Sequence, residues 1–127
     1  MPLNREVDDH QVRAVRVDAR WTLTLIDGRL RRPLGTTDNV SVSGMRFRSA
    51  VPMRVGGVVF AEILVPGKAR VTVAARIVRR EGPENGQFMY GARFAKVYDE
   101  GRRHLGEAIL AIRRAEQDPG SGLRRVA

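Results

Sequence analysis

Hydrophobic residues alternate with polar residues over several short segments between residues 21 and 97. A period of two is typical of strands that bury one face. Turn signals separate these segments, including Asp27-Gly28, which favours a tight hairpin. Six short strands of this kind predict an all-β domain folded as a small six-stranded antiparallel barrel, because closure removes exposed strand edges. We expect the strands at residues 21–26, 29–40, 45–49, 58–65, 69–80 and 87–97.

Two stretches between residues 21 and 97 depart from simple alternation. The second expected strand contains Pro33 and Gly35, which disfavour a regular central strand. We therefore expect that strand to lie at an edge or to carry a bulge. The polar segment EGPENG, residues 81–86, has the composition of a loop.

The hydrophobic period changes near the C-terminus. Leu105, Ile109 and Ile112 follow the spacing of one helix face. Asp99 stands where an N-cap residue would begin such a helix. We predict a helix over about residues 99–116, with its apolar stripe packed on the mouth or flank of the barrel.

The composition suits a single domain. The chain has 127 residues, 43% of them hydrophobic, and no apolar run approaches the roughly 20 residues of a membrane helix. It has no cysteine, two histidines and no secretory signal pattern at its start, so we expect a cytoplasmic protein without disulfides, metal or cofactor. The expected organisation is a flexible arm at 1–14, one domain at 15–116 with the barrel at about 21–97, and a disordered tail at 117–127.

The net charge is +9, and 21 of the 23 basic residues are arginine. A GC-rich genome and a solvated surface account for such a bias, and so does a phosphate-bearing partner. Composition does not choose between a nucleic acid, a nucleotide and an acidic protein. Arg46 and Arg48 share one face of the third expected strand and are interpreted as surface residues, whereas Arg79 falls on the other face of the fifth strand; we assign no ligand to any of them.

No pattern associated with catalysis occurs in the chain. G-x-S-x-G, H-E-x-x-H and the phosphate-binding Walker loop are all absent. His104 falls within the expected helix beside arginines and is interpreted as a surface residue. The sequence therefore argues against an enzyme.

Arg16 and Arg20 precede the first expected strand. The residues between them give no helical pattern, so we expect both guanidinium groups on a mobile arm. A guanidinium presents a planar fork of donors that pairs with phosphate oxygens and stacks on bases. Two of them in this setting are typical of a clamp for an anion.

Residues 38–47, DNVSVSGMRF, contain Asn39, Ser41 and Gly44 in the pattern N-x-S-x-x-G. As structure alone, this segment is a polar turn between strands in which Gly44 allows a positive φ. As a binding site, Asn39 offers an amide for a base edge, Ser41 a hydroxyl, and Gly44 a close backbone approach. The residues alone leave both interpretations open.

Together the two segments resemble the PilZ domain family, which carries R-x-x-x-R in an arm before its first strand and [D/N]-x-S-x-x-G at the end of its second. The resemblance covers roughly residues 12–114 and includes VVFAEILVP, VAARIVRR and MYGARF in the expected order. It implies a six-stranded, Greek-key-like antiparallel barrel with a C-terminal helix. It also implies that the chain binds cyclic di-GMP, a bacterial second messenger, as a ligand and not as a cofactor.

The resemblance implies roles for individual residues. Arg16 and Arg20 would grip the phosphates and guanine faces of the ligand. Asn39, Ser41 and Gly44 would read guanine and line the pocket. Asparagine stands at position 39 where aspartate is commoner, which removes a negative charge facing the guanine N–H groups.

A further departure concerns the number of ligands. Val15 occupies a position at which many members of the family have another arginine. A stacked pair of cyclic di-GMP molecules brings four phosphates together and needs additional positive charge. Arg13 is the nearest substitute, so we expect one ligand per chain.

The expected function is a receptor and adaptor that couples the level of cyclic di-GMP to an unidentified effector protein, in motility or exopolysaccharide control. One alternative is a PilZ-like adaptor that binds a protein without nucleotide. Another is a small basic barrel that binds RNA or DNA. Such barrels usually stack bases on exposed aromatic residues, whereas several of the seven aromatic residues here take core-like positions.

Overall fold

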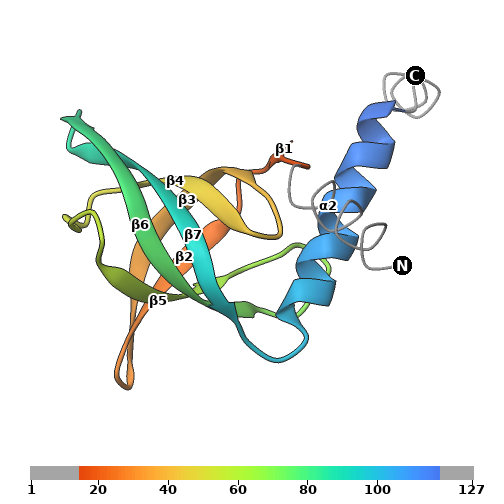
Figure 1. Ribbon diagram of the computed structural model, residues 1–127, viewed down its shortest axis with the longest axis horizontal. Coiled ribbons are helices and arrows are strands. Elements are labelled where there is room, and N and C mark those ends of the chain that lie inside the picture. The colour runs from red at the N-terminus through yellow and green to blue at the C-terminus, as the bar shows by residue number, and fades with distance from the viewer. Residues whose placement is uncertain (1–14, 118–127) are drawn as a thin grey trace, which may run out of the picture.

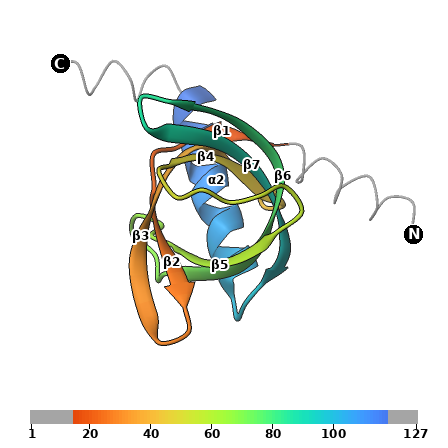
Figure 2. The same ribbon diagram turned by 90° about the vertical axis from the view of Figure 1, so that its left-hand side faces the viewer.

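The computed structural model describes residues 15–117, which form a barrel with a helix beside one end (Figure 1). Six strands follow one another around the barrel in the order β3, β2, β5, β6, β7 and β4, and β4 pairs back to β3. All pairings are antiparallel, and Figure 2 shows the ring of strands. The elements are β1 (Val17–Asp18), β2 (Thr22–Asp27), β3 (Leu30–Val40), β4 (Gly44–Ser49), β5 (Val58–Ile63), β6 (Val71–Glu84), β7 (Gln87–Val97) and α2 (Gly101–Gln117).

This architecture confirms the predicted all-β barrel with a C-terminal helix. The predicted arm at residues 1–14 and all but the first residue of the predicted tail lie outside the described residues. Gln117, assigned to that tail, is the last residue of α2. The second predicted strand is β3, which is bulged as expected but has neighbours on both sides, because barrel closure pairs it with β2 and β4.

The prediction of a loop over residues 81–86 was wrong. The ladder between β6 and β7 continues to the pair Glu84 and Gln87, and only Asn85 and Gly86 form the turn. Both turn residues have positive φ, 53° at Asn85 and 77° at Gly86, as a tight hairpin requires. The segment is polar because this end of the hairpin is exposed on both faces, so its composition did not reveal the strands.

The segment before β2 is extended and paired, which corrects the expectation of a mobile arm for Arg16 and Arg20. Val17 pairs with Val40, and the next residue continues the ladder along β3. From residue 15 to residue 21, side chains that pack on the core alternate with exposed ones. Arg16 and Arg20 therefore belong to the outward face of an ordered strand segment whose inward face includes the buried Ala19.

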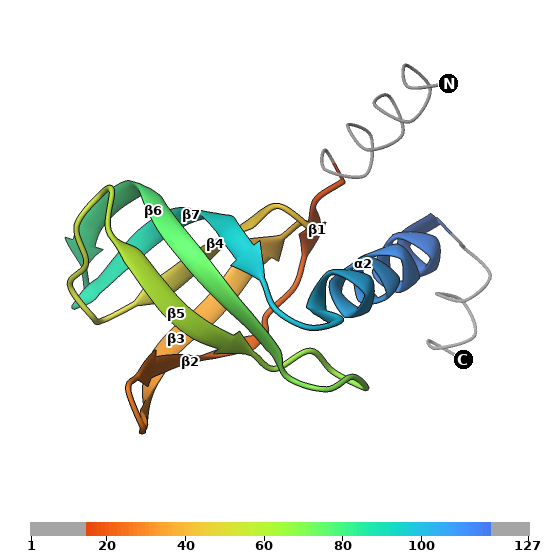
Figure 3. The same ribbon diagram turned by 60° about the horizontal axis from the view of Figure 1, so that its bottom comes forward.

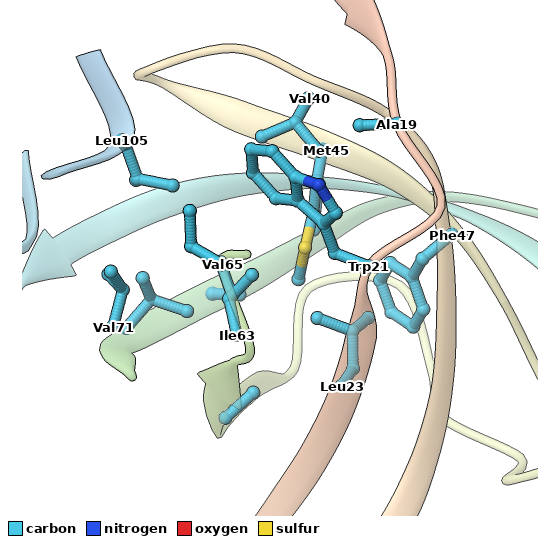
Figure 4. Close-up of a cluster of buried hydrophobic side chains, with 14 of the residues drawn as sticks. Ala19, Trp21, Leu23, Val40, Met45, Phe47, Ile63, Val65, Val71 and Leu105 are labelled. Atoms are coloured by element: carbon cyan, nitrogen blue, oxygen red, sulfur yellow. The ribbon is translucent and has the colours of Figure 1, made fainter. Parts of the chain in front are cut away.

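Side chains from every barrel strand fill the interior (Figure 4). The rings of Phe47 and Tyr90 stack with their centroids 5.2 Å apart. The Tyr90 hydroxyl donates to the Val51 carbonyl oxygen at 2.7 Å and accepts from the Met53 backbone N–H at 2.8 Å. Tyr90 can therefore be buried completely, since its one polar group has partners.

Helix α2 covers one end of the barrel (Figure 3). Leu105 and Ile109 are buried in the same cluster as the strand side chains, which confirms the predicted apolar stripe. Gly101 lets the helix begin against the barrel, because an added β-carbon would lie 2.6 Å from the Val71 side chain and 2.8 Å from that of Val97. Within residues 15–117, no helix is long and apolar enough to cross a membrane.

The helix begins two residues later than predicted. Asp99 has a φ of 54° and lies in the left-handed region, outside the helix. The Glu100 carbonyl oxygen accepts the hydrogen bond from the His104 N–H at 3.0 Å and so starts the helical pattern. Asp99 thus reverses the chain between β7 and α2, and the prediction that it caps the helix was wrong.

One ion pair ties the helix to the turn between β5 and β6. The Lys68 Nζ donates to the Glu107 Oε1 at 2.6 Å. This hydrogen bond holds the pKa of Glu107 below its usual value. Both side chains are partly exposed, so the pair orients the helix more than it stabilises the fold.

Candidate functional site

The two sequence motifs meet where β1 pairs with β3. The Arg16 Nη1 donates to the Asn39 Oδ1 at 3.1 Å, joining the first residue of one motif to the first residue of the other. Arg20 lies 3.5 Å from the Asp38 carboxylate, measured from Nη2 to Oδ1. In an extended chain, residues four apart share a face and lie about 13 Å from each other. The two guanidinium groups can therefore contact different parts of one ligand.

Ser41 lies beneath this surface and not on it. Its side chain is fully buried, and its Oγ accepts from the Ser43 backbone N–H at 3.2 Å. Its own backbone N–H donates to the Gly44 carbonyl oxygen at 2.9 Å, which closes the turn between β3 and β4. In this structure Ser41 shapes the turn that follows Asn39, because its hydroxyl lies within hydrogen-bonding distance of Ser43 and Gly44 in the same turn.

Gly44 is required for a reason other than the predicted positive φ, since its φ is not positive. A β-carbon at this position would lie only 2.4 Å from the Ala92 carbonyl oxygen of β7. The glycine therefore allows β4 to approach β7 closely at the start of their ladder. Gly44 is buried, so its contribution to the site is to set the spacing of these strands.

Arg16 and Asn39 lie at the rim of a hollow of about 440 Å³ on the outer surface of the barrel. Strands β4, β6 and β7 supply the rest of its lining. Gly91 of β7 pairs with Arg46 of β4 on one side and with Arg79 of β6 on the other. Because Gly91 has no side chain, the space between the two arginines stays open. The charged and polar lining residues are Arg16, Asn39, Arg46, Arg79, Glu81 and Arg93.

Four of these six residues are arginines and one is a glutamate, so the hollow is positive. Arg46 and Glu81 lie 3.7 Å apart, from Nη2 to Oε2, and both side chains are about half exposed. The lining therefore holds three more cationic than anionic side chains, so the electrostatics of the hollow favour a negatively charged ligand.

A second hollow of about 430 Å³ adjoins the first. The two share Arg46, Glu81 and Met89, so together they form a trough across β4 and the β6–β7 hairpin. Phe88 lies in the second hollow, and the Arg80 guanidinium carbon is 5.5 Å from the centre of its ring. The Phe88 ring also lies 5.7 Å from the Tyr90 ring and packs on the core, so it is not a free aromatic surface.

The structure brings together some of the predicted site residues and adds others. Arg16 and Asn39 line the hollow, whereas Arg20, Ser41 and Gly44 lie outside its lining. Sequence reasoning assigned no ligand to Arg46 and Arg79 and did not consider Arg93. Arg46 alternates with buried residues along β4, which indicates that it faces outward, but only barrel closure shows that the three arginines line the same hollow.

Comparison with known protein families decides what kind of domain this is. The PilZ domain family matches residues 9–111, which is most of the chain. The chain belongs to the PilZ domain family. Both motifs lie inside the matched region, so the Arg16–Asn39 contact joins two segments of the PilZ domain. No curated protein sequence matches the chain.

Solved structures share the fold of this PilZ domain. The inhibitor of motility MotI/DgrA from Bacillus subtilis is 16% identical with a TM-score of 0.66, covering 82% of this chain and 51% of that chain. YcgR from Escherichia coli, in complex with c-di-GMP, is 14% identical with a TM-score of 0.66, covering 85% and 48%. This PilZ chain spans about half the length of those two proteins.

The PilZ domain of YcgR has also been solved separately, with c-di-GMP. It is 15% identical with a TM-score of 0.62, and the match covers 83% of this chain and 93% of that chain. At such low identity the likeness establishes the shared fold. What the PilZ domain described here binds must be argued from its own residues.

Proposed function

We propose that this PilZ protein is a receptor for cyclic di-GMP. The observation that carries the proposal is the contact between Arg16 and Asn39 at the rim of an arginine-lined hollow. A volume of about 440 Å³ lies within the range of small-molecule sites. The two phosphates of the ligand match the positive lining, and its purines match the guanidinium planes and the amide.

In this proposal each residue has a chemical task. Arg16 and Arg20 bind phosphate oxygens or stack on guanine, since a guanidinium does both. Asn39 pairs with a base edge through its amide. Ser41 and Gly44 hold the turn and the strand spacing that place Asn39 at the rim. The last two assignments differ from the direct contacts that the family resemblance implied.

We further propose that the protein acts as an adaptor in the cytoplasm. Ligand binding at the rim would change the surface formed by β1 and the arginines, and a partner protein would read that change. The partner is unidentified; motility and exopolysaccharide control remain the processes suggested by the family. No set of His, Asp and Glu that could hold a metal occurs within residues 15–117, and the proposed role requires no catalysis.

The nucleic-acid alternative has less support. Trp21, Phe47 and Tyr90 are buried and cannot stack bases, and the exposed Phe60 lies on β5, outside the lining of the arginine-rich hollow. Competition between cyclic di-GMP and single-stranded oligonucleotides at physiological salt separates the two functions. Displacement of cyclic di-GMP by oligonucleotides at comparable concentration would favour the alternative.

Calorimetric titration of the unmodified protein tests the proposal and counts the ligands. We expect saturation at one cyclic di-GMP per chain, because Val15 carries no charge and packs against the core. Val15→Arg should move the plateau towards two ligands, because position 15 is only partly buried and a long arginine side chain can extend past the core to a second pair of phosphates. Absence of binding would overturn the receptor proposal, and a plateau at two for the unmodified protein would contradict only the charge argument.

The variants Asn39→Ala and Ser41→Ala distinguish a residue that recognises the base from one that holds the turn in place. Asn39→Ala should weaken cyclic di-GMP binding by about 1–3 kcal/mol, the usual range for a side chain that reads a base. Its melting temperature should stay near that of the parent, because the side chain is only partly buried. Ser41→Ala should lower thermal stability, at a cost of about 1 kcal/mol for the lost turn bond. Normal binding by a folded Asn39→Ala protein would place the base elsewhere.

A further inference from the structure

Glu81 is the one carboxylate among the described residues that line the arginine-rich hollow. It lies on β6 opposite Met89 of β7, and its side chain is about half exposed. Its nearest charged partner is Arg46, at 3.7 Å. An acidic residue in this position weakens the attraction for phosphates, so electrostatic binding of the phosphates gives no reason for it.

The chemistry of guanine supplies a reason. The pairing edge of guanine presents the N1–H and the N2 amino group as adjacent donors, whereas adenine presents an acceptor at N1 and no amino group at C2. An ionised carboxylate accepts hydrogen bonds and cannot donate, so it matches guanine and repels the acceptor of adenine. Its contact with the Arg46 guanidinium in the free protein engages donors of the same kind.

The Asn39 amide does not provide a negatively charged acceptor for the guanine donors. An asparagine side chain can accept from one guanine donor, but it carries no negative charge. Its Oδ1 already accepts a hydrogen bond from Arg16 at 3.1 Å. A carboxylate elsewhere in the same hollow can provide the missing charge, and Glu81 is in that place.

We propose that Glu81 is a specificity-determining residue that reads the N1–H and N2 amino group of a guanine and so selects guanine over adenine in the bound dinucleotide. This inference rests on the proposed function, since it concerns the same ligand and the same hollow. Arg46 moves from Glu81 to a phosphate when the ligand binds, and the freed carboxylate accepts hydrogen bonds from the base edge.

A simpler role for Glu81 predicts a different result. If Glu81 only pairs with Arg46, removing its charge frees a cation for phosphates that are common to both cyclic dinucleotides. The affinities for cyclic di-GMP and cyclic di-AMP would then change by the same factor. The ratio of the two affinities therefore separates base reading from charge balance or from positioning of Arg46.

The experiment measures the affinity of the full chain for cyclic di-GMP and cyclic di-AMP by calorimetry. Glu81→Gln is expected to lower the preference for cyclic di-GMP at least tenfold, with weaker binding of cyclic di-GMP and equal or tighter binding of cyclic di-AMP. Glu81→Asp should restore part of the preference because it restores the charge. Glu84→Gln is the matched control, since Glu84 lines only the neighbouring hollow and the preference should be unchanged.

Melting temperatures confirm that the variants fold, which we expect because Glu81 is exposed on a strand surface. An unchanged preference in Glu81→Gln overturns the inference while leaving the receptor function intact. An equal loss of preference in Glu84→Gln also overturns it, because the effect would then be general. If the unmodified protein binds neither dinucleotide, the receptor function itself fails and the inference fails with it.

Discussion

Arg16→Ala and Arg20→Ala are each expected to weaken cyclic di-GMP binding at least tenfold, which corresponds to about 1.4 kcal/mol. A charge-assisted hydrogen bond contributes roughly 1.5–3 kcal/mol, so the loss of even one contact reaches this threshold. The two variants test different contacts with the ligand, because Arg16 lies at the hollow beside Asn39 whereas Arg20 is held by Asp38. Calorimetric titration at physiological salt measures both.

Two control variants sharpen this result. Arg103→Ala removes an exposed arginine of α2 that is already paired with Glu100 and Glu107, so binding should hardly change. Arg16→Lys keeps the charge but loses the planar fork, and should recover only part of the affinity. Equal small losses at Arg16, Arg20 and Arg103 would mean that the protein attracts the ligand only through its general positive charge.

Gly44→Ala is expected to destabilise the domain by about 3 kcal/mol, the upper part of the range for overpacking a core. The added β-carbon would lie 2.4 Å from the Ala92 carbonyl oxygen, so β4 and β7 must separate. For a domain of this size the melting temperature should fall by about 10 °C. Thermal unfolding followed by circular dichroism gives this value directly.

Gly106→Ala is the matched control for the cost of adding a methyl group. Its β-carbon would meet only the Val42 side chain, at an ordinary 3.9 Å, and alanine favours a helix more than glycine does. The control should be as stable as the parent or slightly more stable. A Gly44→Ala protein with the same melting temperature as Gly106→Ala would show that the strands separate without cost and that Gly44 is not a spacing residue.

The strands of the barrel could be predicted because their order along the chain is written in local patterns. Period-two alternation identified β2, β4 and β7 to within two residues, and the turn between β2 and β3 is formed by Gly28 and Arg29, one residue later than predicted. The same alternation was present in residues 15–21, yet the absence of a helical pattern between Arg16 and Arg20 was interpreted as a mobile arm. The β6–β7 hairpin extends beyond the predicted strands because its end is exposed on both faces and so shows no alternation.

The candidate site was likewise predictable only in part. The sequence by itself identified both motifs and the family resemblance, because the residues of each motif lie close together along the chain. Only the tertiary structure decided that Ser41 is buried, that Arg16 contacts Asn39, and that Glu81 lines the same hollow as Arg16 and Asn39. The physical reason is barrel closure. It places β7 between β6 and β4 and pairs β4 with β3, so that side chains more than sixty residues apart in sequence line one surface.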